Sequence, residues 1–210
     1  MQNSLTNHIR NIIASHKAGY VFTHVDFFSL GNEATVERIL SRLFEEGVIR
    51  RLRRGLYFKP EISRWGEVPP SHSAIVNALS RMMRTKFLPD GANALYQLGL
   101  TTQIPMKQVY LTEKQISDIV IGKSIIEFRK VSQKKLSGRG KRAGIYLSAI
   151  EYLGKNEAFD ESIQSKIAQT LNEKEITDLK SAAKNRSAWV KEAVEHIIAK
   201  ASSVRIYKAL

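Results

Sequence analysis

A helix followed directly by a basic hairpin is the feature that most constrains the fold of this chain, and it lies between Thr23 and Pro60. Asn32 can cap a helix over residues 34–46, whose apolar residues recur every three or four positions from Val36 to Leu43. Two β-favouring segments, residues 48–52 and 56–58, follow the helix and are joined through Arg53-Arg54-Gly55. A helix able to enter a DNA groove, followed by such a hairpin, predicts a winged helix-turn-helix.

Two shorter segments before this helix also carry helical signals. Apolar residues at helical spacing, beginning at Leu5 and Ile9, predict a first helix over residues 4–16. Thr23 and Asp26 have the spacing of a capping box, which predicts a second helix reaching about Ser29.

The rest of the chain is predicted to hold two further parts. Pro60, Pro69 and Pro70 indicate a linker, and Trp65 beside them is expected to pack modules together. Helices are expected over residues 71–84, 90–98 and 143–153, strands over 108–111 and 124–130, and three more helices after residue 160. The predicted class is α+β, with a winged helix over residues 1–62, a mixed α/β module over 71–154 and a helical segment over 155–210.

The charge balance points to a polyanionic partner. The chain has 210 residues and a net charge of +13, of which +4 lies in residues 1–60, +7 in 61–154 and +2 in 155–210. Such an excess favours encounter with nucleic acid but gives no sequence specificity. The chain has no cysteine, no recognisable secretory signal and no apolar run long enough for a membrane span. These features are compatible with a reducing cytosol, and we expect no membrane contact.

One face of the helix after Asn32 is a candidate for reading bases. Thr35, Arg38 and Arg42 share a face that the apolar stripe does not use, and Ser41 joins them in the candidate set. Arginine can pair with guanine through two hydrogen bonds, which is worth roughly 1–3 kcal/mol of discrimination. The alternative is a solvated face in which Arg38 and Arg42 pair with two acids, Glu45 and Glu46.

The hairpin supplies a second group of candidates. Arg50, Arg51, Arg53 and Arg54 lie within five residues without an intervening acid. Because successive strand residues face opposite sides, Arg50 and Arg51 cannot both contact the same line of phosphates. We therefore expect Arg53 and Arg54 to contact DNA at the turn, with Arg51 as a weaker member.

A second basic run is expected to form a mobile loop that follows phosphates. Its candidate residues are Arg129, Lys130, Lys134, Lys135, Arg139, Lys141 and Arg142. The glycines Gly138, Gly140 and Gly144 superficially resemble a dinucleotide-binding loop, but their spacing is wrong and the acidic ribose partner is missing.

No catalytic or metal-binding motif emerges from the sequence. The histidines show no His-Glu-x-x-His pair, and there is no Gly-x-Ser-x-Gly segment. We therefore expect no enzyme activity, no metal, no cofactor and no small-molecule substrate. Four aromatic residues, Tyr96, Tyr110, Phe128 and Tyr146, could stack on bases, which keeps RNA binding open as an alternative.

The segment from Phe44 to Pro60, with its Arg-x-x-Arg-Gly-Leu-Tyr piece, resembles the winged helix of AbiEi-type antitoxins from type IV (abortive infection) toxin-antitoxin systems. The segments 89–105, containing Leu-Gly-Leu-Thr-Thr-Gln, and 109–112 are similar to the second module of that family. The resemblance covers roughly residues 5–154, and Arg50, Arg51, Arg53 and Arg54 match the family's basic wing.

The resemblance implies a cytoplasmic repressor of its own toxin operon that binds promoter repeats in double-stranded DNA. The implied partner is a nucleotidyltransferase-like toxin, and the chain lacks the Gly-Ser dipeptide that such toxins carry. Two other functions remain open: a module whose C-terminal helices bind a toxin or another protein, with DNA contact secondary, and an RNA-binding module.

Overall fold

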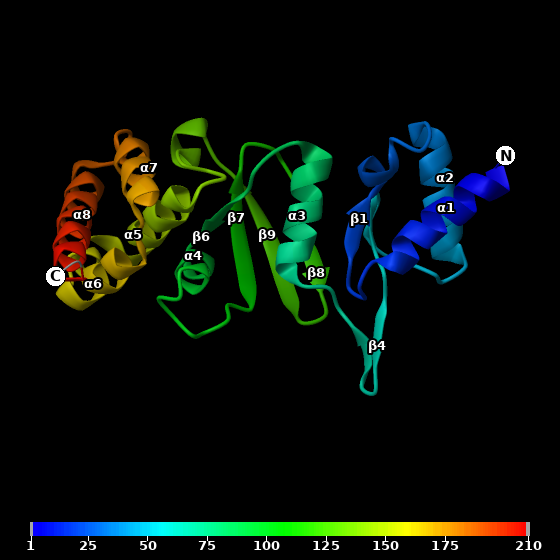
Figure 1. The fold of residues 1–210 in the computed structure, drawn as a ribbon, viewed down its shortest axis with the longest axis horizontal. Coiled ribbons are helices and arrows are strands. Elements are labelled where there is room, and N and C mark those ends of the chain that lie inside the picture. The colour runs from blue at the N-terminus through cyan, green and yellow to red at the C-terminus, as the bar shows by residue number, and fades with distance from the viewer. Residues whose placement is uncertain (1, 209–210) are drawn as a thin grey trace. The chain divides into compact units, whose positions relative to one another are not determined.

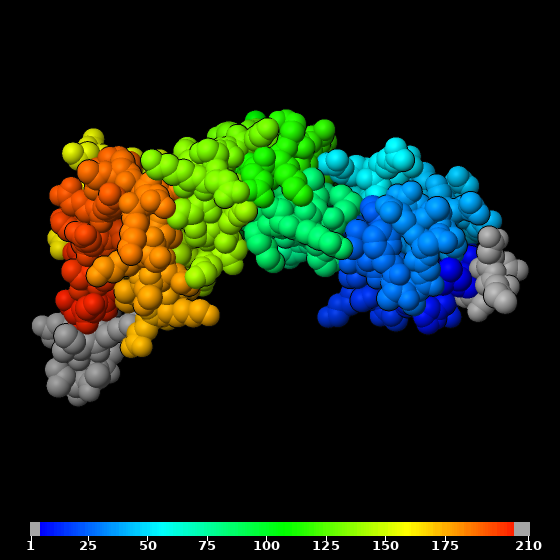
Figure 2. All heavy atoms as spheres, turned by 90° about the horizontal axis from the view of Figure 1, so that it is seen from above, coloured from blue at the N-terminus to red at the C-terminus, as the bar shows by residue number. Residues whose placement is uncertain are grey.

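A computed structural model describes the backbone of residues 2–208 and the side chains of residues 5–203. The chain forms two compact units, the first ending at Thr85 and the second beginning at Lys86. Figure 2 colours the first unit from blue to blue-green and the second from green to red.

The first unit begins with the predicted helices and basic hairpin in the predicted order, and with one strand, β1, that the sequence does not predict (Figure 1). They are α1 (Gln2–Ser15), β1 (Val21–Thr23), the 3₁₀ helix η1 (His24–Phe27), α2 (Glu33–Glu45), β2 (Arg50–Arg53) and β3 (Leu56–Phe58). The strands form an antiparallel sheet in the order β1-β3-β2. Buried side chains from α1, β1, η1, α2 and β3 form one core, in which Val36, Leu40 and Leu43 are fully buried.

Local capping defines both helical segments before the hairpin. The Asn32 side chain accepts a hydrogen bond of 2.9 Å from the Thr35 amide, as the sequence predicts for the start of α2. Thr23 and Asp26 form the predicted capping box, but the segment that they cap is a four-residue 3₁₀ helix that stops before Ser29. Phe27 is buried in the core, so tertiary packing holds a turn that is too short to be stable alone.

The predicted linker contains a second hairpin, which stands clear of the other elements of its unit (Figure 1). It consists of β4 (Glu61–Ser63) and β5 (Gly66–Val68). The prediction that Trp65 packs modules together is wrong, because its side chain lies at the hairpin turn and is 84% exposed. The Arg64 guanidinium lies 4.8 Å from the Trp65 ring, and Glu67 on β5 accepts a hydrogen bond from Arg50.

Helix α3 (His72–Met83) completes the first unit. Ser71 caps it, and its buried residues face β1 and η1. Arg81 donates to Asp26 at 2.8 Å, and this hydrogen bond raises the pKa of Arg81. The first compact unit therefore extends to residue 85, beyond the limit of 62 that the sequence predicts, because Asp26 both caps η1 and binds α3.

The second unit begins with a four-stranded sheet. Its elements are β6 (Leu88–Asp90), α4 (Ala92–Gln97), β7 (Lys107–Thr112), β8 (Ile119–Ile121) and β9 (Ser124–Lys130). The strand order is β6-β7-β9-β8, with β7 and β9 parallel and the other pairs antiparallel. The sequence predicts β7 and β9 but misses β6 and β8. Asp90, which falls in the helix expected over residues 90–98, instead lies in β6 and accepts a hydrogen bond of 2.6 Å from Ser148.

Helices form the rest of the second unit (Figure 1). They are the 3₁₀ helix η2 (Gln133–Leu136), α5 (Arg142–Ala158, broken at Gly154), α6 (Glu161–Thr170), α7 (Glu173–Ala183) and α8 (Ala188–Lys208). The apolar faces of α5, α6, α7 and α8 pack into one core with α4, whereas Leu136 of η2 packs with Leu88 and Leu111 of the sheet. The predicted α+β class, with helices at the C-terminal end, is thus observed. In the described part of the chain, no helix has the length and apolar character needed to cross a membrane.

Candidate nucleic-acid interface

A groove of about 1000 Å³ lies between α2 and the β2–β3 hairpin of the first unit. Its charged lining is mostly basic, with five arginines and two glutamates. The lining residues are Ala34, Glu37, Arg38, Ser41, Arg42, Glu45, Arg51, Arg53, Arg54, Gly55 and Tyr57. Six of the eight residues that the sequence proposes on the helix and the hairpin therefore meet in this groove.

The basic residues of α2 form no ion pair with any acid whose side chain is described. Glu46, one of the two acids expected to pair with them, instead accepts a hydrogen bond of 2.6 Å from Arg10 on α1. Among the residues with described side chains, no acid forms an ion pair with Arg38 or Arg42. The alternative of an internally paired helix face is therefore not observed.

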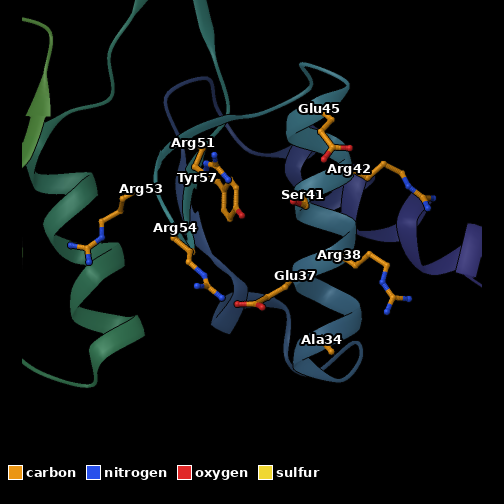
Figure 3. A pocket seen from close by; sticks show the side chains of 11 residues that line it. Ala34, Glu37, Arg38, Ser41, Arg42, Glu45, Arg51, Arg53, Arg54 and Tyr57 are labelled. Atoms are coloured by element: carbon orange, nitrogen blue, oxygen red, sulfur yellow. The ribbon is translucent and has the colours of Figure 1, made fainter.

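The two arginines of α2 and the arginine of the turn lie on different sides of the helix. In Figure 3, Arg38 and Arg42 extend from the side of α2 that faces away from the hairpin, whereas Arg54 points toward Glu37. Ser41 lies on the hairpin side. The surface of α2 between these arginines therefore has positive charge on both sides. A helix that lies in a DNA groove has a phosphate backbone on each side, and this charge distribution matches that arrangement.

The turn places Arg54 at the edge of the groove. Arg53 on β2 pairs with Leu56 on β3, so that only Arg54 and Gly55 form the turn. Gly55 has a φ of +76°, and a Cβ atom there would lie 3.2 Å from Nδ1 of His24. Glycine is therefore required both by the backbone conformation and by the close approach of the His24 ring.

The other hairpin arginines are more constrained. Arg50 donates to Glu67 at 2.9 Å and to the Gly47 carbonyl at 2.9 Å, and it does not line the groove. The Arg51 guanidinium lies 4.5 Å from the Phe44 ring, and Arg53 is half-buried and directed toward α3 (Figure 3). Of the four hairpin candidates, Arg54 is exposed and makes no hydrogen bond, ion pair or ring contact with the described side chains.

Thr35 also lies outside the groove. It is half-buried and lines a small cavity of about 10 Å³ with Thr6, Arg38, Ile39 and Arg42. Its amide already donates to Asn32. Two acids also line the groove: Glu37, which the sequence does not single out, and Glu45, which it offers only as a partner of Arg38 and Arg42. Both follow from the same helical spacing that selects Arg38 and Arg42.

The second basic run lies in the second unit and is not a free loop. It comprises the end of β9, η2, a turn and the start of α5, and four of its seven cations pair with acids. The pairs are Arg129 with Glu127 and Asp90, Arg139 with Glu113, Lys141 with Asp178, and Arg142 with Glu175. Lys130, Lys134 and Lys135 are exposed and have no ion pair among the described side chains.

The contacts of this run also change the pKa of one acid, Glu127. Hydrogen bonds from Lys107 and then Arg129 hold the pKa of Glu127 below its ordinary value. Arg186 in turn fixes η2 by donating at 2.9 Å to the Lys135 carbonyl, while its guanidinium pairs with Glu151 at 3.2 Å. The run is thus held by contacts from β6, β7, α5 and α7 and the segments beside them.

The aromatic residues proposed for base stacking are mostly inside the protein. Tyr110, Phe128 and Tyr146 are 4%, 5% and 0% exposed, respectively, and only Tyr96 reaches the surface. Burial raises the pKa of Tyr110. These residues therefore offer no stacking platform for a single strand.

Comparison with known proteins places the chain in a family without assigning it a function. No curated protein matches the chain. One family model matches residues 8–179, a range that includes the groove, the sheet of the second unit and its helices as far as α7. The chain therefore belongs to DUF6088, a family of unknown function.

Proposed function

We propose that the protein binds double-stranded DNA through the groove between α2 and the β2–β3 hairpin. The observation that carries this proposal is the gathering of five arginines in one open groove, with Arg38, Arg42 and Arg54 unpaired among the described side chains. An α-helix fits the major groove, and a basic turn beside it can contact the adjacent phosphates. Arg38 and Ser41, which lie on different sides of α2, then reach base edges from the inserted helix, and Arg54 contacts the backbone.

The resemblance to AbiEi-type antitoxins supports a narrower version of this proposal. The protein acts in the cytoplasm as an antitoxin and represses its own type IV toxin-antitoxin operon by binding promoter repeats. Its partner is a nucleotidyltransferase-like toxin encoded beside it. The narrower version rests on the similar segments 44–60, 89–105 and 109–112, whereas DNA binding rests on the groove.

Two single substitutions test the division of roles within the groove. Arg54→Ala is expected to weaken binding to all duplexes and to lower the slope of log K against log salt by about 0.9, because one phosphate contact is lost. Arg38→Ala is expected to cost about 1–3 kcal/mol on the preferred sequence and much less on a scrambled duplex. Mobility-shift titrations with DNA from upstream of the gene, at several salt concentrations, measure both effects.

Arg64→Ala is the matched control, since Arg64 is also exposed in the first unit but lies on the β4–β5 hairpin outside the groove. It is expected to retain wild-type sequence preference. Wild-type affinity in both groove variants would contradict the proposal, and equal losses on specific and scrambled DNA in Arg38→Ala would remove its role in reading bases.

Binding of a protein partner is a second candidate function, and the β4–β5 hairpin favours it. Ile62 and Trp65 on this hairpin are 71% and 84% exposed, and tryptophan and arginine are enriched among residues that dominate protein interfaces. Ser63 accepts from the Trp65 amide and donates to the Gly66 carbonyl, so the turn is internally braced. A rigid projecting hairpin of this kind can insert into a pocket of another protein.

The double variant Ile62→Ser/Trp65→Ser is expected to lose most of its co-purification with the product of the neighbouring gene, because two apolar anchors are removed. DNA binding should stay within about twofold of wild type, since neither residue lines the groove. Val120→Ser, at an exposed apolar residue of β8, is the control. Undiminished co-purification of the double variant would rule out this hairpin as the docking element.

A further inference from the structure

Three side chains of metal-binding type converge where η1 meets the first turns of α2. They are His24 on η1 and Glu33 and Glu37 on α2, and their ligand atoms all lie within 4.8 Å of one another. Glu33 and Glu37 are four residues apart, so the helix projects both carboxylates from the same face. His24 reaches them from a separate element, which makes the cluster a product of the tertiary fold.

The cluster does not satisfy its own polar groups. Nε2 of His24 lies 3.6 Å from Oε1 of Glu33, which is longer than a hydrogen bond. Nδ1 of His24 is buried and, within the described residues, has no hydrogen-bond partner. Two carboxylates four residues apart on a helix repel each other. A cation between the three groups would remove this repulsion.

The neighbouring residues hold the imidazole in place. The His24 ring centroid lies 5.3 Å from that of Phe28, and the His24 side chain is only 15% exposed. Nε2 is the nitrogen that faces the carboxylates, since it lies 3.6 Å from Oε1 of Glu33. Nδ1 lies close to Gly55 on the hairpin, where an added Cβ atom would be only 3.2 Å away. Glu33 is 64% exposed, so its carboxylate is free to adjust. Because the imidazole is fixed and at least one carboxylate can move, the three ligand atoms can approach one another around an ion.

We propose that His24, Glu33 and Glu37 bind a divalent first-row transition metal such as Zn²⁺. One imidazole nitrogen and two carboxylate oxygens form a mixed donor set that suits Zn²⁺, whereas Ca²⁺ and Mg²⁺ prefer oxygen ligands alone. Metal–ligand distances of about 2.0–2.2 Å require the three donors to approach one another slightly, and water completes the coordination. The sequence does not reveal this site through a recognised metal-binding motif, because a turn and a loop separate His24 from Glu33.

Metal binding at this site changes the charge of the groove between α2 and the β2–β3 hairpin. Glu37 also lines the groove, where Arg54 points toward it (Figure 3). A bound cation neutralises this carboxylate and so makes the groove more attractive to phosphate. This consequence rests on the proposed function, whereas metal binding does not.

Isothermal titration of the full-length protein with ZnCl₂, in the absence of DNA, tests the proposal. We expect one ion to bind per chain at this site, with Glu33→Gln/Glu37→Gln and His24→Gln each weakening its affinity at least about tenfold. The glutamine variants keep the shape of the glutamates, and circular dichroism checks that all variants fold. The matched control is Glu192→Gln/Glu195→Gln, which removes two exposed carboxylates from α8 and should leave the affinity unchanged.

A second measurement identifies which histidine binds the metal. Addition of Zn²⁺ should shift the imidazole NMR signals of His24 more than those of His8, His16, His72 and His196. Absence of Zn²⁺ binding, or binding that folded His24 and glutamate variants retain at wild-type affinity, would overturn the proposal. Because the titration contains no DNA, a failure of the DNA-binding proposal leaves its result unaffected.

Discussion

Replacing Arg38 and Arg54 together with glutamate is expected to weaken binding of the full-length protein to its upstream DNA by roughly a hundredfold, or about 2.7 kcal/mol. Each substitution removes a positive charge from the groove and adds a negative one to a lining that already contains Glu37 and Glu45. The salt dependence should fall with the affinity, because fewer counterions are released from the DNA. Fluorescence anisotropy with a labelled duplex at several salt concentrations measures both quantities.

The exposed lysines of the second unit provide the control for this experiment. Lys130→Glu/Lys134→Glu reverses the same amount of charge at residues without an ion pair in the described structure. We expect a loss of less than about tenfold, consistent with secondary phosphate contacts. An equal or larger loss in the lysine variant would place the main DNA contact in the second unit.

Gly144→Ala is expected to destabilise the second unit by about 2 kcal/mol. A Cβ atom at Gly144 would lie 2.6 Å from the Gly138 carbonyl oxygen, 2.8 Å from its carbon and 2.9 Å from Cδ1 of Leu88. Two of these atoms belong to the backbone and cannot move aside as a flexible side chain can. Overpacking costs about 3 kcal/mol in such a site, and the better helix propensity of alanine offsets about 1 kcal/mol.

Gly31→Ala is the matched control in the first unit. Its Cβ atom would meet only side-chain carbons, Cδ2 of Leu5 at 3.2 Å and Cγ2 of Val36 at 4.0 Å. Urea unfolding followed by circular dichroism should show a change below about 0.5 kcal/mol for this variant. Equal losses in the two variants would show that the contact between Gly138 and Gly144 is not tightly packed.

The sequence predicts the winged helix well because its signals are local. Asn32 caps α2, and the apolar stripe from Val36 to Leu43 identifies the buried face, all within 12 residues. The β4–β5 hairpin is missed because its three-residue strands lie between prolines, and one of its supports is the long-range pair of Arg50 with Glu67. Strand β6 is missed for a similar reason, since Pro89 argues against a strand and its only partner is β7.

The candidate site is also predicted only in part, because local spacing can be read from the sequence and long-range pairing cannot. Helical spacing brings Arg38, Ser41 and Arg42 to the groove, as predicted. Spacing cannot tell which cations are neutralised, because Arg139 and Lys141 pair with Glu113 and Asp178, more than 20 residues away. The glycines at 138 and 144, which superficially resemble part of a dinucleotide-binding loop, are explained by the close approach of two backbone segments.

The placement of the two tryptophans gives the protein an intrinsic optical probe. Trp65 is already largely in water at the β4–β5 turn, whereas Trp189 is half-buried against the helical core of the second unit. Tryptophan emission shifts to longer wavelength as a buried ring becomes solvated, so most of the spectral change on unfolding should come from Trp189. Tryptophan fluorescence therefore follows unfolding of the second unit selectively. If the fluorescence transition and the far-ultraviolet circular dichroism transition have different midpoints, the two units unfold independently.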